Sequence, residues 1–330
     1  MIYTNQLLVT GATGFVGQAL CISAVSRGYQ VRRAVRMPSS ISGGHDESVV
    51  GNIDSKTDWR AALEGIDVVI HLAARVHIMY ETNTDPLTAF RSTNVQATSQ
   101  LALQAAAAGV KRFIFISSVK VNGEESEPGR PFTAEDIPAP REPYGISKME
   151  AERVLLEIAA VTSMEVVIIR PPLVYGPGVK ANFFKLLKWL SRGMPMPLGA
   201  IENRRSLVAL ANLVDLIILC CHHPNAANQI FLVSDDDDLS TTTLVKKMAK
   251  ALGRPVWLIP IPQSWLLVAA KVLNKSAVVG RLCESLQVDI SKTKCLLSWA
   301  PPVTVDEELR SIVRGSDLSN RRAALPYTDT

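Results

Sequence analysis

A buried strand that runs into a glycine-rich turn and then into a helix limits the fold of this chain most strongly. The sequence reads QLLVT at 6–10 and TGATGFVG at 10–17, and helical spacing follows from Phe15 to Arg27. The three glycines permit positive φ, let backbone amides approach a pyrophosphate and allow close packing of helix on strand. Because the turn joins a strand to a helix near residue 10, it predicts the first unit of a dinucleotide-binding sheet.

Apolar strand segments and helical segments alternate through the first half of the chain. This alternation predicts an α/β fold with a parallel, doubly wound sheet. Further strands are predicted at residues 30–36, 68–72, 112–117 and 166–170, and the clearest helices at 93–108 and 147–160.

The pattern changes after Pro171 and Pro172, where a turn at 175–178 and an amphipathic segment at 182–192 follow. We interpret this change as the beginning of a smaller substrate-binding lobe. The predicted division is a Rossmann-type NAD(P)-binding domain at 1–175 that 205–235 rejoins, a lobe at 176–204 and 236–315, and a flexible tail at 316–330.

Later segments complete this prediction. Strands are expected at 206–210 and 229–233, and the second is expected to return to the main sheet. Ser240 follows an acidic run and is expected to cap the next helix.

Composition excludes several classes of protein. Of the 330 residues 47% are hydrophobic, and 35 Lys and Arg against 31 Asp and Glu give a net charge of +4. Such a chain has enough apolar material for a core, which excludes intrinsic disorder. The charge is too small and too dispersed to predict a nucleic-acid or anionic-membrane surface.

Cysteine use and apolar stretches bear on location. The five cysteines form no CxxC pair and have no metal-ligand spacing near the histidines, so we expect reduced thiols and no metal site. The first residues lack the features of a signal peptide, and the apolar stretch 207–221 is too short to span a bilayer. We therefore expect a cytoplasmic protein with no stable membrane insertion and no nucleic-acid partner; a homodimer stays open.

The end of the second predicted strand bears on the choice of dinucleotide. An NAD-selective site usually has a carboxylate there for the ribose 2′-hydroxyl, whereas this chain has Arg36. A guanidinium at Arg36, helped by Arg33 or Arg32, suits a 2′-phosphate, so NADP is favoured and NAD stays possible. The alternative is that these arginines are ordinary solvent-exposed residues at the end of a strand and do not bind the cofactor.

A tyrosine and a lysine four residues apart can form a proton-transfer pair. Tyr144 and Lys148 lie in YGISK at the entrance of a predicted helix, so both project from one face. An ammonium beside a phenol favours the phenolate, which can then act as a base. YxxxK alone is often a solvated helix face, but Ser118 ends a strand at the edge where ligands bind in parallel sheets. Ser118 can therefore polarise the substrate oxygen while Tyr144 moves its proton.

Six motifs in order resemble those of one superfamily. They are TGATGFVG, HLAA at 71–74, STNVQAT, FISS before VKVNG, YGISK, and RPPLVYGPG at 170–178. From residue 6 to about 313 the chain resembles the extended short-chain dehydrogenase/reductase superfamily, in its NAD(P)-dependent epimerase/dehydratase branch. The resemblance implies that Ser118, Tyr144 and Lys148 are the catalytic triad.

The resemblance also implies a set of cofactor contacts. Asn94 would support the helix of the active site, and Asn52 stands where many relatives have an aspartate near the adenine. The implied cofactor-binding residues are Gly11, Thr13, Gly14, Phe15, Val16, Gly17, Arg36, Asn52, Ile53, Leu72, Ala73, Ala74, Asn94, Tyr144, Lys148 and Pro171.

The lobe resembles a nucleotide-sugar site, with a UDP-sugar as the implied substrate. By this resemblance Asn182 and Arg205 hold the diphosphate, and Met196, Pro197 and Gly199 offer backbone groups to the uracil. Ser118 would contact the sugar. Arg281 is a further diphosphate candidate, with an ordinary surface arginine as the alternative.

Three reactions compete at this site. The dehydratases of the superfamily carry an acid pair where this chain has Val119 and Lys120, which leaves 4-keto reduction and 4-epimerisation. The C-terminal segments resemble bacterial O-antigen enzymes that reduce a UDP-4-keto-6-deoxy-N-acetylhexosamine to UDP-N-acetylquinovosamine in polysaccharide biosynthesis, and Arg36 agrees with NADPH use. We therefore expect the 4-ketoreductase, with a UDP-hexose 4-epimerase that holds NAD tightly as the alternative. A non-catalytic dinucleotide-binding protein is the second alternative.

Overall fold

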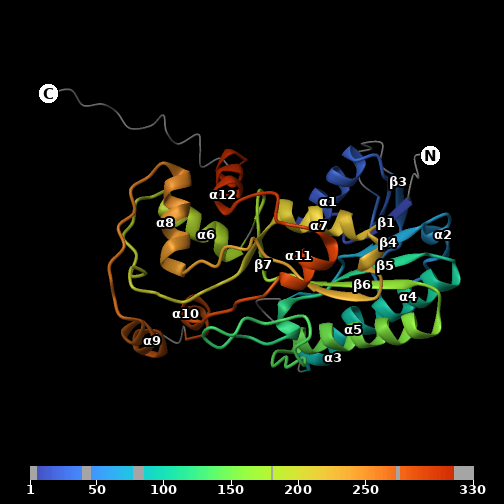
Figure 1. Cartoon of the computed structure of the whole chain (residues 1–330), viewed down its shortest axis with the longest axis horizontal. Helices are drawn as coiled ribbons and strands as arrows, with labels where there is room; N and C mark the ends of the chain where they lie inside the picture. Colours follow the sequence, from blue (N-terminus) through green and yellow to red (C-terminus); the bar gives the residue numbers. More distant parts are fainter. Residues whose placement is uncertain (1–5, 39–45, 77–84, 180, 273–275, 316–330) are drawn as a thin grey trace.

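A seven-stranded parallel sheet forms the centre of the larger half of the molecule (Figure 1). The structure is a computed structural model that describes residues 6–38, 46–76, 85–179, 181–272 and 276–315. The strand order is β3-β2-β1-β4-β5-β6-β9, and every neighbouring pair is parallel. The predicted Rossmann-type, doubly wound α/β fold is confirmed. The strands are β1 Gln6–Thr10, β2 Gln30–Val35, β3 Asp46–Val49, β4 Val68–His71, β5 Arg112–Ile116, β6 Glu165–Arg170 and β9 Gln229–Leu232.

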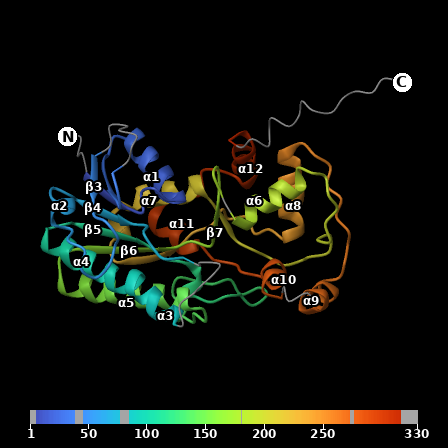
Figure 2. The same ribbon diagram turned by 180° about the vertical axis from the view of Figure 1, so that it is seen from behind.

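Helices cover both faces of this sheet, as Figures 1 and 2 show from opposite sides. Two separate apolar clusters lie between helices and sheet, because side chains of a central parallel strand alternate between two buried faces. One face is covered by α1 Phe15–Ser26, α7 Leu210–Cys220 and α11 Ser291–Leu297, and the other by α2 Arg60–Leu63, α4 Ala97–Ala107 and α5 Pro143–Val161, with α3 Pro86–Arg91 beside α5.

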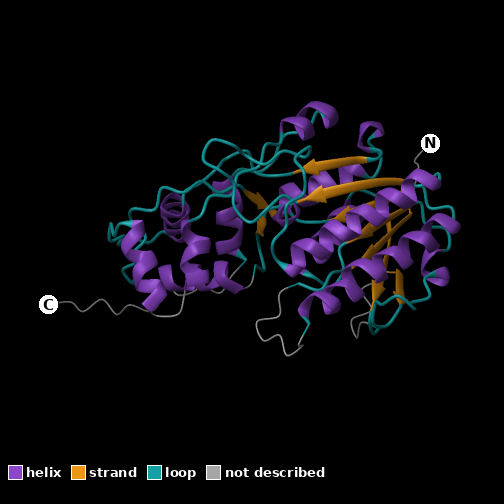
Figure 3. Cartoon of the chain, turned by 90° about the horizontal axis from the view of Figure 1, so that it is seen from below, coloured by secondary structure: helices purple, strands orange, loops and turns teal. Residues whose placement is uncertain are grey.

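A smaller lobe follows Arg170 and has an apolar core of its own (Figure 3). Tyr175 and Leu187 are fully buried in that core. Tyr175, which the sequence predicts to begin a turn, is the last residue of a strand. It pairs with Ala209 in a small parallel sheet. The lobe contains β7 Leu173–Tyr175, β8 Leu207–Ala209, α6 Ala181–Leu190, α8 Thr241–Leu252, α9 Gln263–Val272, α10 Ser276–Cys283 and α12 Val305–Arg314.

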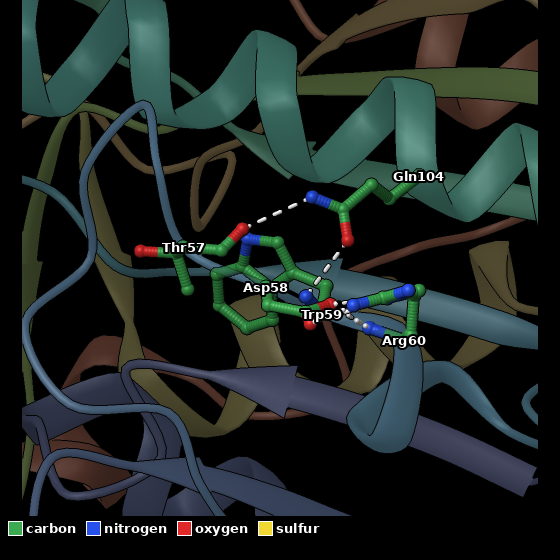
Figure 4. Close-up of polar contacts among 5 residues, drawn as sticks. All are labelled: Thr57, Asp58, Trp59, Arg60 and Gln104. Carbon is green, nitrogen blue, oxygen red and sulfur yellow. Dashed lines mark hydrogen bonds and ion pairs between the residues drawn. The ribbon is translucent and has the colours of Figure 1, made fainter.

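One glutamine fastens the segment that leads into α2 (Figure 4). Gln104 of α4 accepts from the backbone N–H of Trp59 at 2.8 Å and donates to the backbone oxygen of Thr57 at 3.0 Å. The Trp59 side chain is completely buried, so this segment is anchored by packing as well as by hydrogen bonds. The chain just after Asn52 and Ile53, two of the predicted cofactor contacts, is therefore fixed against α4.

Three short helical turns connect these elements. A π-helix at Ser92–Gln96 leads into α4, and two 3-10 turns occupy Val119–Val121 and Pro224–Ala226. Within the described ranges, no helix has both the length and the apolar character needed to cross a bilayer.

Candidate functional site

The glycine turn after β1 forms an open cradle at the N-terminus of α1. Gly11 has φ +67°, and its carbonyl accepts from the Gly14 N–H at 2.9 Å. A Cβ on Gly17 would lie 2.2 Å from that carbonyl oxygen, and one on Gly11 would lie 2.8 Å from the backbone nitrogen of Ala73. Both positions therefore require glycine.

The amide end of α1 is free to receive an anion. Its first turn contains no acidic residue, and Gly14 caps it without a side-chain hydrogen bond. Thr13 and Gly14 are exposed, and Phe15 and Val16 are half-buried beside them. Backbone N–H groups and the positive end of the helix dipole together suit a pyrophosphate, so these residues fit the phosphates of a dinucleotide.

A buried histidine braces the strand ends beneath this cradle. Thr10 Oγ1 accepts from the Ala73 N–H at 3.2 Å and lies 2.7 Å from His71 Nδ1, while His71 Nε2 lies 2.9 Å from Thr98 Oγ1. Burial lowers the pKa of His71 to about 3, so the ring is neutral. One nitrogen of the neutral ring donates and the other accepts, so His71 pairs with both hydroxyls and links β1, β4 and α4. The predicted groove residues Leu72, Ala73 and Ala74 follow directly.

Arg36 is exposed immediately after β2, where a ribose 2′-substituent is expected. Both Arg32 and Arg33 pair with acids of β3, so their help to Arg36 stays a prediction. Arg32 bonds Asp46 at 2.7 Å, and Arg33 lies 3.4 Å from Glu47. Arg36 is thus the arginine of this strand end that remains exposed.

The predicted triad residues gather at the carboxyl end of β5. Ser118 and Tyr144 are joined by a hydrogen bond between their side chains, and Ser118 Oγ also accepts from the Lys120 N–H at 3.2 Å. Burial raises the pKa of Tyr144 to about 12, and the bond to Ser118 acts in the opposite direction. The phenol is therefore protonated at neutral pH in the absence of a positive neighbour.

Lys148 lies one turn further along α5 and is almost completely buried. Its Nζ donates to the Ile116 oxygen at 2.8 Å and stands 4.3 Å from the centre of the Phe115 ring. Burial lowers the pKa of Lys148 to about 7, and the charge of Glu152 opposes this shift. A lysine with such a pKa can change its protonation state near neutral pH.

Asn94 connects the segment after β4 to the helix that carries the triad. Its Oδ1 accepts from the Arg75 N–H at 2.8 Å, and its Nδ2 donates to the Arg75 oxygen and to Ser147 Oγ, both at 3.0 Å. Ser147 in turn donates to the Tyr144 oxygen at 2.8 Å. Asn94 thus joins the segment after β4 to α5, which is the geometry that its predicted role requires.

A buried ion pair that sequence reasoning missed lies behind the triad. Arg170 and Glu152 approach to 2.6 Å with both side chains buried, and Arg170 also donates to Asn122 Oδ1 at 3.1 Å. Pro171 follows Arg170, and its oxygen accepts from the Val119 N–H at 3.0 Å. The pair therefore ties α5 to β6 beside the loop that carries Ser118. The sequence feature that could have indicated this ion pair is Glu152, an acid four residues after Lys148 on the same helix face.

Most predicted substrate residues have partners within the lobe. The N–H groups of Met196 and Gly199 donate to the oxygens of Trp257 and Ile259 at 2.9 and 3.1 Å, while Pro197 is exposed. Arg205 is half-buried, and its guanidinium donates to the Glu284 oxygen at 3.1 Å. Asn182 lies on α6 and Arg281 on α10, but their side chains are outside the part of the chain that the structure describes.

Comparison with known proteins gives matches over nearly the whole chain. A family model described as "NAD dependent epimerase/dehydratase family" matches residues 7–234. The chain is 48% identical over 320 residues to a UDP-glucose 4-epimerase of Vibrio cholerae. The aligned residues make up 96% of this chain and 97% of that protein.

Two solved structures share the fold. MoeE5 in complex with UDP-glucuronic acid and NAD is 24% identical with a TM-score of 0.75, covering 97% of this chain and 100% of that one. UDP-N-acetylglucosamine 4-epimerase from Bacillus cereus is 17% identical with a TM-score of 0.77, covering 93% and 98%.

Proposed function

The chain belongs to the NAD dependent epimerase/dehydratase family, and from that premise we propose that it is a UDP-hexose 4-epimerase. The observation that carries the proposal is the 48% identity, over almost the full length of both chains, to a UDP-glucose 4-epimerase. The hydrogen-bonded Ser118 and Tyr144 beside the buried Lys148 support it, because epimerisation at C4 needs one proton relay.

In this proposal the triad residues have separate roles. NAD, when bound, supplies the hydride acceptor and donor for C4 of the sugar. Ser118 hydrogen-bonds the C4 oxygen, and Tyr144 takes the hydroxyl proton and later returns it. Lys148, in its charged form, favours the phenolate of Tyr144 and so counters the burial that raises the pKa of that phenol.

We propose the predicted contacts for the rest of the substrate and cofactor. Gly11, Gly14 and the amide end of α1 hold the pyrophosphate, and Arg205 neutralises part of the UDP diphosphate. Asn182 and Arg281 are its further proposed partners. The segment 196–199 holds the uracil through groups other than the N–H groups of Met196 and Gly199, which already bond Trp257 and Ile259. We also retain the predicted division, with the lobe beginning at residue 176 as the part that binds the nucleotide sugar, while α7, β9 and α11 pack on or in the main sheet.

A second candidate is NADPH-dependent reduction of a UDP-4-keto-6-deoxy-N-acetylhexosamine at C4. The observation in its favour is the exposed Arg36 after β2, which suits a 2′-phosphate. A reductase must exchange its dinucleotide at each turnover, whereas an epimerase regenerates NAD within one catalytic cycle. The use of dinucleotide therefore separates the two candidates.

The experiment gives both types of substrate to the purified protein. For an epimerase, NMR of the sugar detects the C4 epimer of UDP-glucose or UDP-N-acetylglucosamine, with no net change in the absorbance of reduced nucleotide. Stoichiometric consumption of NADPH with the 4-keto sugar, and no epimer, would overturn the proposal in favour of the reductase. The Tyr144→Phe protein serves as the inactive control in both assays.

A further inference from the structure

Three of the five tryptophans lie exposed in the lobe. Trp189, Trp257 and Trp265 are 49%, 69% and 72% exposed, whereas Trp59 and Trp299 are buried in the larger half. Single exposed apolar residues are common, whereas exposed tryptophans that share one surface with other apolar side chains indicate a partner.

Two of these tryptophans belong to an exposed apolar surface at the end of the lobe. We call it the lobe-end surface and define it as Met194, Trp257, Ile259, Trp265, Leu267 and Val268, all of which are exposed. Met196 pairs with the strand-like segment at Trp257 to Ile259, which brings Met194 close to it. The same segment leads into α9, and Figures 1 and 2 show α9 at the outer end of the lobe, away from β1 to β3.

The chain around this surface carries basic residues and no acids. Residues 171–201 contain four Lys and Arg and residues 239–283 contain seven, of which Lys247 pairs with Asp306 of α12 at 3.2 Å; neither stretch contains an Asp or Glu. Lys185, Lys188, Arg192, Lys250 and Lys271 are exposed. None of these five forms an ion pair with another residue that the structure describes. The net charge of +4 for the whole chain therefore conceals an excess of basic residues in these two stretches of the lobe.

We propose that the lobe-end surface docks on an anionic phospholipid bilayer. Tryptophan suits the boundary between headgroups and acyl chains because its ring is apolar and its N–H is polar. Leu267 and Val268 add apolar area on α9, and the exposed Lys271 of the same helix and Arg192, two residues before Met194, complement anionic headgroups. The absence of acids in both stretches distinguishes this occupant from a mixed-charge protein surface. Docking of this kind rests on the surface and needs no membrane-spanning helix.

The docking would leave the predicted active site accessible. Tyr144 and Lys148 lie on α5, and Figure 1 shows α5 in the larger half, away from α9. None of the residues of the lobe-end surface is among those proposed to bind substrate or cofactor, although the backbone oxygens of Trp257 and Ile259 bond the N–H groups of Met196 and Gly199 in the proposed uracil segment. The inference therefore goes beyond the proposed function and does not depend on it.

The test is co-sedimentation of the full chain with vesicles. Vesicles of phosphatidylethanolamine and phosphatidylglycerol should retain the protein, vesicles of phosphatidylcholine alone should not, and added salt should release it. The apolar variant Trp265→Ser with Val268→Ser and the charge variant Lys188→Glu with Arg192→Glu should each weaken binding at least about tenfold. Tryptophan emission should shift to shorter wavelength with the anionic vesicles.

Matched controls make the result specific. Ile22→Ser with Val161→Ser removes equally exposed apolar residues from the larger half, and Lys56→Glu with Arg153→Glu reverses charges there. Both controls should bind as the unmodified protein does, and circular dichroism should show that all four variants are folded. Failure of the unmodified protein to sediment, or binding that the charge variant leaves unchanged, would overturn the proposal. A change from oligomer to monomer in the apolar variant, without vesicle binding, would assign the surface to a second copy of the chain.

Discussion

The side-chain amide of Asn94 donates to Ser147 Oγ at 3.0 Å, and this bond joins the π-helix turn before α4 to the first turns of α5. Both ends of the Asn94 side-chain amide form hydrogen bonds. Oδ1 accepts from the Arg75 N–H, and Nδ2 donates to the Arg75 oxygen as well as to Ser147. The residue is buried, so each lost bond leaves a polar group without a partner. Tyr144 and Lys148 depend on this junction for their position relative to β4.

We expect Asn94→Ala to lower kcat at least about tenfold and to reduce the free energy of unfolding by about 1–3 kcal/mol. Ser147→Ala removes only one of these bonds and should have the smaller effect on both. Steady-state kinetics and urea unfolding measure them. Because Asn94 acts through the position of Tyr144, kcat should fall more than KM rises; an unchanged kcat in Asn94→Ala would contradict this role.

Tyr144→Phe should lower turnover at least about a hundredfold and leave dinucleotide affinity nearly unchanged, because only the transferred proton is removed. Tyr29→Phe is the matched control, since the Tyr29 hydroxyl contacts His222 at 3.0 Å and has no part in the proposed site. Turnover and calorimetric titration with the dinucleotide check both variants. Near-normal turnover in Tyr144→Phe would refute the proposed triad.

Gly17→Ala should destabilise the protein by about 1–3 kcal/mol and weaken dinucleotide binding, because the added Cβ would stand 2.2 Å from the Gly11 oxygen. Either α1 or the phosphate-binding turn must then move. Gly315→Ala is the control: there the nearest atom to the new Cβ is the Ser311 oxygen at 3.5 Å. Thermal unfolding and calorimetry compare the two variants, and equal behaviour would show that the turn tolerates a side chain.

Arg36→Ala tests which dinucleotide the protein prefers. If the guanidinium binds a 2′-phosphate, the substitution should weaken NADP by about 1–3 kcal/mol and spare NAD. Arg153→Ala, an exposed arginine of α5, should change neither affinity. A clear preference of the unmodified protein for NAD would show that Arg36 does not select the cofactor, and would strengthen the epimerase proposal.

His71 should contribute to acid sensitivity, because burial lowers its pKa from 6.5 to about 3. The unfolded chain then binds a proton between these pH values that the folded protein does not, so stability falls as the pH drops below 6.5. The slope for one group approaches about 1.4 kcal/mol per pH unit. Urea unfolding of the unmodified protein and of His71→Asn between pH 7 and about 5 should give curves that converge toward low pH. Parallel curves, or a His71 ring that titrates normally by NMR, would contradict the assignment.

The sequence predicted those parts of the fold that local patterns determine. The glycine turn, the strand–helix alternation and YGISK each lie within a short segment, and the confirmed sheet follows from them. By contrast, β3 reads DESV, a polar segment with no apolar alternation. It forms a strand because Arg32 and Arg33 of β2 offer charge partners to its acids, and that pairing is visible only once the two segments lie together.

Several features of the candidate site depend on contacts between distant segments, so local sequence patterns do not predict them. Arg170 stands in the motif RPPLVYGPG, but the sequence does not predict that it pairs with Glu152 and Asn122. That pairing depends on how β6, α5 and the loop after β5 meet. The sequence shows His71 only as part of the motif HLAA. Its neutral state follows from burial between Thr10 and Thr98, which the sequence does not predict. A charge summed over the whole chain does not reveal the two basic, acid-free stretches of the lobe.

The route of the chain between the sheet and the lobe has a consequence for protein engineering. The chain leaves the main sheet after Arg170, returns at Gln229 to add β9 at the edge, and then leaves again toward α8. A fragment that ends near residue 175 would lack β9 and also α7, which covers one face of the sheet through its contact with α1. Neither half is therefore a contiguous gene segment. A chimaera that grafts the lobe of one relative onto the sheet of another needs matched crossovers at each of these junctions.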